Sequence, residues 1–346
     1  MALQHSSGAT LLIDLNSNWE EIGALNIHNV VTQRDLRAAV IGAGVFGRHH
    51  AGKYKRIPGV ALTAIADLDP ETRREAGTLF GVPVVADWRD LLGEVDIVSI
   101  CTPAVTHAEI VGEFLMAGAN VLVEKPIATD LDEADELIQL AADNGLVLTV
   151  GHQERYVLAK AGLFDRDSVP LRIECSRTGP WTGRATDVSV VLDVMIHDLD
   201  LIHKLVPGGL GEVRARERTL HGRFPDEVTA RLTFESGTDV ELFASRTAEA
   251  RKRWMKVVYV DGSIEIDFLA RTVINTTART LKPLDLNDPL AESVLACVDS
   301  VREGAMALVR PEEARRALET ALLIEEVAAP AREVFASRPS TVRASA

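Results

Sequence analysis

The stretch from Arg37 to Gly47 constrains the fold of this chain more than any other. An apolar strand-like run meets three glycines there, at Gly42, Gly44 and Gly47, and a helix-like segment follows. The pattern predicts strand, tight turn and helix: Gly42 permits the turn, Gly44 leaves room for a pyrophosphate, and Gly47 lets the helix pack on the strand. The N–H groups that open the helix would face the phosphates of a dinucleotide.

A carboxylate follows at the distance that such a turn requires. Residues 60–66 read as the next strand, which ends at Asp67, 20 residues after Gly47. A carboxylate at this place accepts hydrogen bonds from a ribose 2′-hydroxyl and repels a 2′-phosphate. The alternative is an ordinary glycine-rich turn with an aspartate at a strand end. Together the two features favour NAD over NADP as cofactor.

Composition narrows the range of partners. The 346 residues suggest about two domains, and 47% hydrophobic with 25% charged residues is typical of a globular protein. The net charge of −14 argues against nucleic acid or an anionic membrane as partner, so an anionic ligand needs a local cluster of arginine and lysine. The three cysteines form no CxxC motif, and no secretory pattern or transmembrane-length apolar run occurs. We therefore expect a cytoplasmic protein with free thiols.

Strand-like and helix-like segments alternate over residues 37–156. Further strands are expected at 82–85, 95–101, 120–124 and 146–150, and helical segments at 87–92, 106–117 and 131–144. Repeated βα units with short connections predict a doubly wound parallel α/β sheet, which is a Rossmann-type domain. Ligands of such sheets bind at the carboxyl ends of the strands, where the sequence places Asp67, Thr102-Pro103, Glu124-Lys125-Pro126 and Gly151-His152.

The pattern changes after Tyr156. A strand at 171–177 and a helix at 188–206 precede four strand-like runs, at 212–221, 227–235, 238–247 and 254–268, and two helices at 289–303 and 311–328 close the chain. Successive strands with short turns predict a second, α+β domain over 157–330 with an antiparallel sheet. Residues 1–36 form a predicted N-terminal extension, with a candidate strand at 10–15 and a candidate helical turn at 19–25. The sequence leaves open whether it is an added hairpin, an oligomer contact or a poorly ordered tail. Residues 331–346 form a predicted tail.

Three side chains have the character of reactive groups. Lys125 ends a strand between Glu124 and Pro126, and the proline stops the ladder and fixes the local direction of the chain. Asp193 and His197 are four residues apart on one face of an otherwise apolar helix, where they need partners or a polar cavity. The alternatives are a solvated lysine and a buried, satisfied Asp–His pair. No metal is expected, because no HExxH or comparable ligand spacing occurs.

The motifs together resemble a known family. Gly42-x-Gly44-x-x-Gly47, Cys101-Thr-Pro103 with His107, Glu124-Lys-Pro126 and Asp193-x-x-x-His197 follow the order seen in the Gfo/Idh/MocA oxidoreductases, and the resemblance covers residues 37–328. It implies a Rossmann domain, a second domain with an open, mostly antiparallel sheet that often supports homodimers or homotetramers, and NAD(P)-dependent oxidation of sugar or cyclitol hydroxyls.

The resemblance also implies roles for matching residues. Lys125 and His197 would be the catalytic pair, and Asp193 would orient the substrate. The implied cofactor-binding residues are Gly42, Gly44, Val45, Phe46, Gly47, Asp67, Thr102, Pro103, His107, Glu124 and Lys125.

A closer resemblance, in residues 177–184, 187–200 and 244–246, is to the UDP-N-acetylglucosamine 3-dehydrogenases that supply diaminosugar for lipid A. It implies a substrate-binding set of Arg155, Arg177, Arg184, Asp193, His197 and Arg246. Arg253 is a further candidate, because a diphosphate in so acidic a protein calls for local arginines.

Three functions remain open. The first is NAD-dependent oxidation of the 3-hydroxyl of UDP-N-acetylglucosamine, and the second is oxidation of a free sugar, an inositol or another nucleotide sugar. In both, His197 is the better base and Lys125 stabilises the developing alkoxide, although the sequence leaves open which one finally takes the proton. The third is a non-catalytic sensor of NAD or sugar, which would have no need of this lysine–histidine pair.

Overall fold

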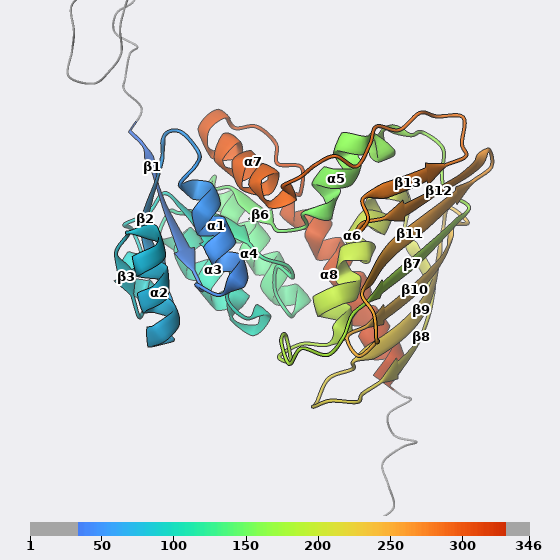
Figure 1. Ribbon diagram of the computed structural model, residues 1–346, viewed down its shortest axis with the longest axis horizontal. Helices are drawn as coiled ribbons and strands as arrows, with labels where there is room; N and C mark the ends of the chain where they lie inside the picture. The colour runs from blue at the N-terminus through green and yellow to red at the C-terminus, as the bar shows by residue number, and fades with distance from the viewer. Residues whose placement is uncertain (1–33, 330–346) are drawn as a thin grey trace, which may run out of the picture. The chain divides into compact units, whose positions relative to one another are not determined.

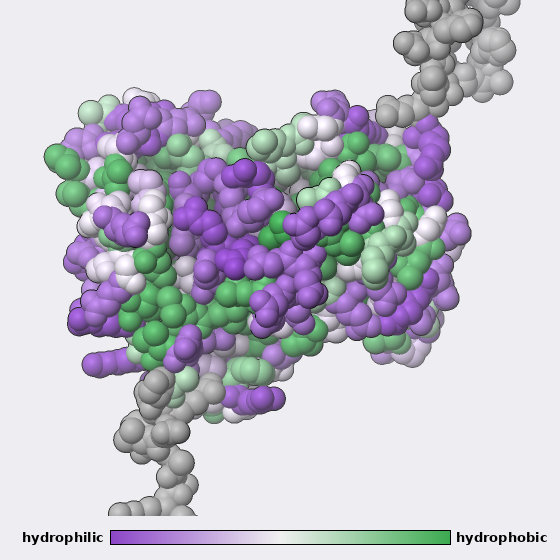
Figure 2. Space-filling view, turned by 180° about the vertical axis from the view of Figure 1, so that it is seen from behind, coloured by the Kyte–Doolittle hydropathy of each residue, from purple (hydrophilic) through white to green (hydrophobic). Residues whose placement is uncertain are grey.

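The computed structural model describes residues 34–329. The strand and helical turn predicted at residues 10–15 and 19–25, and the tail at 331–346, lie outside the described residues. Residues 36–329 lie in one compact unit, and this unit contains two sheets (Figure 1). Polar and charged residues cover most of the face seen from behind, with hydrophobic residues in patches between them (Figure 2).

The first sheet is parallel and has six strands in the order β3-β2-β1-β4-β5-β6. Every residue of β4 and β6 is buried, as expected for a sheet that is covered on both faces. The strand order reverses between β1 and β4, which is where such sheets bind ligands. The predicted doubly wound sheet is confirmed. Its strands are β1 (Leu36–Ile41), β2 (Val60–Ala66), β3 (Val84–Val85), β4 (Ile97–Ile100), β5 (Asn120–Val123) and β6 (Leu148–Val150).

Helices cover both faces of this sheet, and alternate side chains of β1 point to one face or the other. Ala38 and Val40 pack into the core beneath α1 (Val45–Tyr54) and α2 (Pro70–Phe80). Their neighbours Ala39 and Ile41 point to the opposite face, beneath α3 (His107–Met116) and α4 (Leu131–Asp143). Asp69 and Asp130 cap α2 and α4 by accepting hydrogen bonds from the first N–H groups of each helix.

The second sheet has seven strands in the order β13-β12-β11-β7-β10-β9-β8. Only β7 and β10 pair in parallel, and the other neighbours are antiparallel, as predicted. Buried and exposed residues alternate along β9, because one face of the sheet packs on the core and the other faces solvent. The strands are β7 (Arg172–Thr178), β8 (Leu210–Arg218), β9 (Glu227–Phe234), β10 (Asp239–Ser245), β11 (Lys252–Tyr259), β12 (Gly262–Asp267) and β13 (Thr272–Asn275).

The predicted helix at 188–206 is divided into two parts. A π-helical turn, η5 (Val191–Met195), leads directly into α6 (Ile196–Leu205). Such turns insert one residue into a helix and are frequent at functional sites. Here the π-helical turn contains Asp193, and the regular helix that follows it carries His197. Short 3₁₀ segments occur at η2 (Trp88–Leu91), η3 (Ala104–Thr106) and η4 (Leu163–Asp165).

The remaining helices connect the two sheets. Helix α5 (Glu154–Ala161) contains the predicted domain boundary at residue 156. Helices α7 (Pro289–Glu303) and α8 (Pro311–Ala328) have the predicted bounds. The sequence assigns α7 to the second domain, yet its buried face packs with α1 on the first sheet. The predicted run at 254–268 is the hairpin β11–β12, and β13 was not expected.

Candidate active site

The three glycines of the turn after β1 have different surroundings. A Cβ on Gly47 would lie 1.7 Å from the carbonyl oxygen of Gly42. One on Gly42, whose φ is +88°, would lie 2.7 Å from the carbonyl oxygen of Cys101. The backbone therefore packs too closely for a side chain at either position. A Cβ on Gly44 would meet nothing within 4 Å, so space is open where the motif predicts a pyrophosphate.

The start of α1 and the end of β2 complete the fit to a dinucleotide. No side chain of the described residues caps α1, and its first turn holds no acidic residue, so its N–H groups remain available to phosphates. Asp67 accepts a 2.6 Å hydrogen bond from the N–H of Ala43, which holds its carboxylate beside the glycine turn. Exposed apolar side chains follow the same strand ends and offer a surface for the cofactor to cover: Val45, Phe46, Leu68 and Val105.

His107 joins the loops that follow β4 and β5. Its buried ring lies 2.7 Å from the carbonyl oxygen of Pro126 and 3.0 Å from that of Thr102. Burial lowers the pKa of His107, although both carbonyl contacts oppose the shift. Because both ring nitrogens are engaged inside the protein, His107 supports the loop of Thr102 and Pro103. The cofactor contact that the resemblance implies for His107 stays a prediction.

Glu124 belongs to a network of hydrogen-bonded polar side chains, most of them buried. Its Oε1 accepts a hydrogen bond from Gln153 at 3.2 Å and lies 3.0 Å from His50 Nε2. The other nitrogen of His50 lies 2.9 Å from Ser99 Oγ, which is also bonded to the hydroxyl of Tyr54. Burial acts to raise the pKa of Glu124, but the hydrogen bond and charge of His50 outweigh it, and the pKa is lowered. This network of side chains therefore connects α1 to the end of β5.

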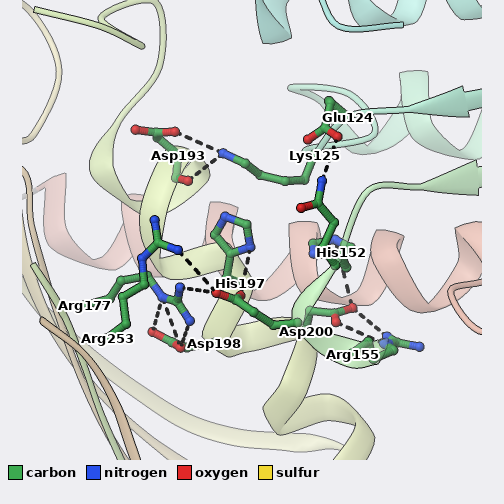
Figure 3. A network of polar contacts seen from close by, with 12 residues as sticks. Glu124, Lys125, His152, Arg155, Arg177, Asp193, His197, Asp198, Asp200 and Arg253 are labelled. Atoms are coloured by element: carbon green, nitrogen blue, oxygen red, sulfur yellow. Dashed lines mark hydrogen bonds and ion pairs between the residues drawn. The ribbon is translucent and has the colours of Figure 1, made fainter. Parts of the chain in front are cut away.

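Lys125 connects the end of β5 to the π-helical turn η5. Its Nζ donates to the backbone carbonyl oxygen of Asp193 at 2.6 Å and to Oδ1 of the same residue at 3.0 Å (Figure 3). Burial acts to raise the pKa of Asp193, but the lysine charge outweighs it, so the pKa lies below its usual value. The side chains of Lys125 and Asp193 are 16% and 26% exposed, so both remain within reach of a ligand.

His197 lies beside this pair and faces a carboxylate that the sequence did not reveal. Its Nδ1 lies 3.2 Å from Oε2 of Glu154, the first residue of α5. Arg177 donates a hydrogen bond to Oε1 of the same carboxylate at 2.6 Å and another to Asp198. Burial opposes ionisation, but the charges of Arg177 and His197 hold the pKa of Glu154 well below its usual range. In sequence, the signal was an acidic residue two positions after Gly151-His152.

A second histidine lies against the first. The rings of His152 and His197 meet edge to face with centroids 6.3 Å apart. His152 is buried, and neither of its ring nitrogens has a hydrogen-bond partner among the described residues. Burial lowers the pKa of His152 to about 4. It is therefore a neutral ring at physiological pH.

The predicted substrate-binding arginines divide into two groups. Arg155, Arg177 and Arg246 are buried, and each is paired with an aspartate. Those partners are Asp200, Asp198 and Asp226, which stand 20 to 45 residues away in sequence. Arg184 is exposed, and the side chain of Arg253 is 52% exposed. Among these five arginines, Arg184 and Arg253 are therefore the better exposed, while the other three are bound by partners within the protein; contact of any of them with a substrate stays a prediction.

Within residues 34–329 no three histidine, cysteine, aspartate or glutamate side chains are grouped as a metal site would require. All three cysteines are unpaired. In the same part of the chain, no helix has the length and apolar character needed to cross a membrane.

Comparisons with known proteins agree with this geometry. Residues 36–152 match an oxidoreductase family with an NAD-binding Rossmann fold, and residues 163–265 match the Gfo/Idh/MocA C-terminal domain. The UDP-N-acetylglucosamine 3-dehydrogenase of Acidithiobacillus ferrooxidans is 35% identical over 243 residues, which make up 69% of this chain and 76% of that protein. A solved structure of that enzyme matches with a TM-score of 0.79 at 32% identity, over 84% of this chain and 97% of the other.

Inositol dehydrogenases are also similar. The inositol 2-dehydrogenase of Mycolicibacterium gilvum is 31% identical over 247 residues, 66% of this chain and 70% of that protein. A scyllo-inositol dehydrogenase from Lactobacillus casei with bound NAD(H) and scyllo-inositol shares the fold, with a TM-score of 0.74 at 21% identity, over 86% of this chain and 98% of the other. The chain is an NAD-binding dehydrogenase that belongs to the Gfo/Idh/MocA oxidoreductase family.

Proposed function

We propose that this dehydrogenase oxidises the 3-hydroxyl of UDP-N-acetylglucosamine to a ketone with NAD as the hydride acceptor. One observation carries the catalytic part of the proposal: Lys125, Asp193 and His197 meet beside the strand ends that bear the glycine turn. Similarity to a UDP-N-acetylglucosamine 3-dehydrogenase supports the choice of substrate.

Each residue has a defined task in this proposal. The glycine turn and Asp67 would hold NAD, which would supply the hydride acceptor for the carbinol carbon. His197 takes the hydroxyl proton as the C–O bond becomes a carbonyl. The ammonium of Lys125 stabilises the negative charge that develops on the oxygen. Asp193 keeps Lys125 in place and accepts a hydrogen bond from a neighbouring hydroxyl of the sugar.

The two exposed arginines suit the diphosphate of the substrate. Arg184 lies in the loop between β7 and η5, and Arg253 lies on β11 with its NH1 4.0 Å from Oε1 of Glu154. The guanidinium of Arg246 donates to the carbonyl oxygens of Ala185 and Val188, and so shapes the loop that carries Arg184. We assign diphosphate contact to Arg184 and Arg253.

The second candidate is oxidation of an inositol or a free sugar, which similarity to inositol 2-dehydrogenases favours. A panel of UDP-N-acetylglucosamine, other nucleotide sugars, free sugars and inositols, each with NAD and with NADP, decides between them through NADH or NADPH absorbance. Turnover of UDP-N-acetylglucosamine supports the first function. Turnover of inositol alone would replace it with the second, and a lack of any turnover together with measurable NAD binding would favour a sensor.

The cellular setting belongs to the same proposal. We propose a cytoplasmic homodimer or homotetramer that supplies a 3-keto nucleotide sugar to an aminating enzyme of lipid A synthesis. The unpaired cysteines suit a reducing compartment. Light scattering of the purified protein tests the oligomeric state.

A further inference from the structure

We propose that Glu154 is the positioning residue of His197: its carboxylate keeps a proton on Nδ1, so that Nε2 is the atom that takes the proton of the substrate. The inference rests on the proposed role of His197 as base. It adds a residue that neither the sequence motifs nor the family resemblance assigned.

The carboxylate of Glu154 is held in place by its neighbours. Glu154 opens α5, its Oε1 accepts a 2.6 Å hydrogen bond from Arg177, and its side chain is only 15% exposed. Arg177 is itself held by Asp198, with NH2 and Oδ1 2.7 Å apart. The second oxygen of Glu154 is therefore presented to Nδ1 of His197 at 3.2 Å. Neither of these two buried atoms has a hydrogen-bond partner among the described residues, so each is available to the other at the distance of an ion pair.

The protonation state of Glu154 fixes the direction of this contact. Its pKa lies well below the usual range, so the carboxylate is ionised at neutral pH and acts only as an acceptor. Nδ1 of a neutral His197 must then carry the hydrogen, which leaves the lone pair on Nε2. In Figure 3 the other ring nitrogen of His197 is turned to the side on which Lys125 lies. That is where the substrate hydroxyl is proposed to bind.

The neighbouring His152 provides a comparison with His197, because it has no carboxylate as close as Glu154. It is buried next to His197, yet its nearest carboxylate oxygen, on Asp200, is 3.9 Å from Nε2, and its pKa falls to about 4. His197, by contrast, has a carboxylate oxygen of Glu154 3.2 Å from Nδ1. The groups that are coupled to the charge of His197 come from several elements: Glu124 at the end of β5, His152 after β6, Glu154 on α5, Asp193 in η5 and Asp198 in α6. Lys125 faces Asp193, and Arg177 on β7 and Arg253 on β11 face Glu154.

The first test needs no turnover and so stays informative even if the proposed substrate is wrong. ¹⁵N NMR of histidine-labelled protein, with the signal assigned by comparison with His197→Asn, reports which ring nitrogen carries the hydrogen. We expect the Nδ1–H form in the unaltered protein at pH 8, and a shift toward Nε2–H in Glu154→Gln. An unaltered protein in which His197 is in the Nε2–H form would overturn the proposal.

The second test is kinetic and uses a matched control. With whichever substrate turns over, Glu154→Gln should lower kcat about 10- to 100-fold with little change in KM. It should also move the acid limb of the kcat/KM profile about one pH unit lower, because the charge that favours the imidazolium is lost. Glu313→Gln removes another carboxylate that is paired with an arginine, and it should leave kcat and the acid limb of the kcat/KM profile unchanged.

A third variant guards against misfolding. Glu154→Asp keeps the charge but shortens the reach, so it should recover part of kcat and return the acid limb toward that of the unaltered enzyme. If instead kcat falls in both variants while the acid limb stays where it was, Glu154 has only a structural role and the proposal is wrong.

Discussion

At the scale of single residues, Lys125 has the most direct part in the proposed chemistry. Its ammonium is held by two oxygens of Asp193 and yet remains partly exposed, so it is both fixed and reachable. Such a cation costs no reorganisation when charge develops on the substrate oxygen. The lysine follows β5 and the aspartate lies in the π-helical turn η5, so their meeting depends on how the first and second halves of the unit pack together.

Replacement of this lysine tests the assignment. We expect Lys125→Ala to lower kcat about 10²- to 10³-fold, because the developing alkoxide loses its preorganised cation. NAD should still bind, since the glycine turn and Asp67 are untouched. NADH absorbance gives the rate and cofactor fluorescence gives the affinity. Activity close to that of the unaltered enzyme would show that another group carries the charge.

Asp67 sets a second residue-scale expectation. Its carboxylate is held beside the glycine turn by the N–H of Ala43, where it would repel a 2′-phosphate. Asp67→Ala should therefore raise kcat/KM with NADP relative to NAD by about tenfold, the effect of roughly one charged contact. The ratio of the two cofactor rates measures this. An unchanged ratio would remove Asp67 from cofactor selection.

The sequence predicts part of this site and not the rest for a physical reason. Lys125, Asp193 and His197 stand out because polar groups interrupt apolar segments. Glu154 does not stand out, because its role depends on Arg177 and His197, which only the fold brings near it. The buried arginines resemble ligand-binding arginines in sequence, since nothing local shows that an aspartate elsewhere in the chain already pairs with each.

At the scale of elements, the turn between β1 and α1 shows how closely its two neighbours pack. Gly47→Ala should prevent stable folding, because its Cβ would lie 1.7 Å from a carbonyl oxygen. Gly44→Ala is the matched control: the space around it is open and its φ is −61°, so the protein should fold with a nearly unchanged Tm. It should still weaken NAD binding, because the added methyl group occupies the place of the pyrophosphate. Thermal unfolding and cofactor titration separate the two effects.

Elements with a strong local pattern are those that the sequence places well. Helices α7 and α8 start at prolines and have the expected bounds. Helix α5 and strand β13 are short and were missed, because few residues carry their pattern. The π-helical turn at Asp193 also has no local signal, since the same apolar run suits a regular helix.

At the scale of the whole molecule, Arg155 joins helices that are distant in sequence. Its buried guanidinium is paired with Asp200 on α6 and with Glu313 on α8, and it donates to the carbonyl oxygen of Leu308. Burial acts to raise the pKa of Glu313, but the charge of Arg155 outweighs it, and the pKa falls to about 2 from 4.5. A lowered pKa in the folded state means that this stabilisation is present above pH 4.5 and is lost as the pH falls through about 2.

Glu313→Gln should therefore lower the free energy of unfolding by about 1–2 kcal/mol at pH 7, allowing for solvent screening. The difference from the unaltered protein should shrink at pH 3. Urea denaturation at both pH values measures it. Glu319→Gln, which removes an exposed partner of Arg315, should change little at either pH. A difference for Glu313→Gln that is the same at pH 7 and pH 3 would contradict the assigned ionisation.

The return of α7 to the first sheet has a consequence for any attempt to divide the protein. Leu290, Val294 and Val298 fill the core beside α1, and Asp288 accepts a 2.5 Å hydrogen bond from Lys53. A fragment that stops after β6 would leave that apolar surface open to water and would aggregate. The part of the chain that holds the cofactor is therefore continuous in space but discontinuous in sequence, and a functional graft of it must carry α7 along.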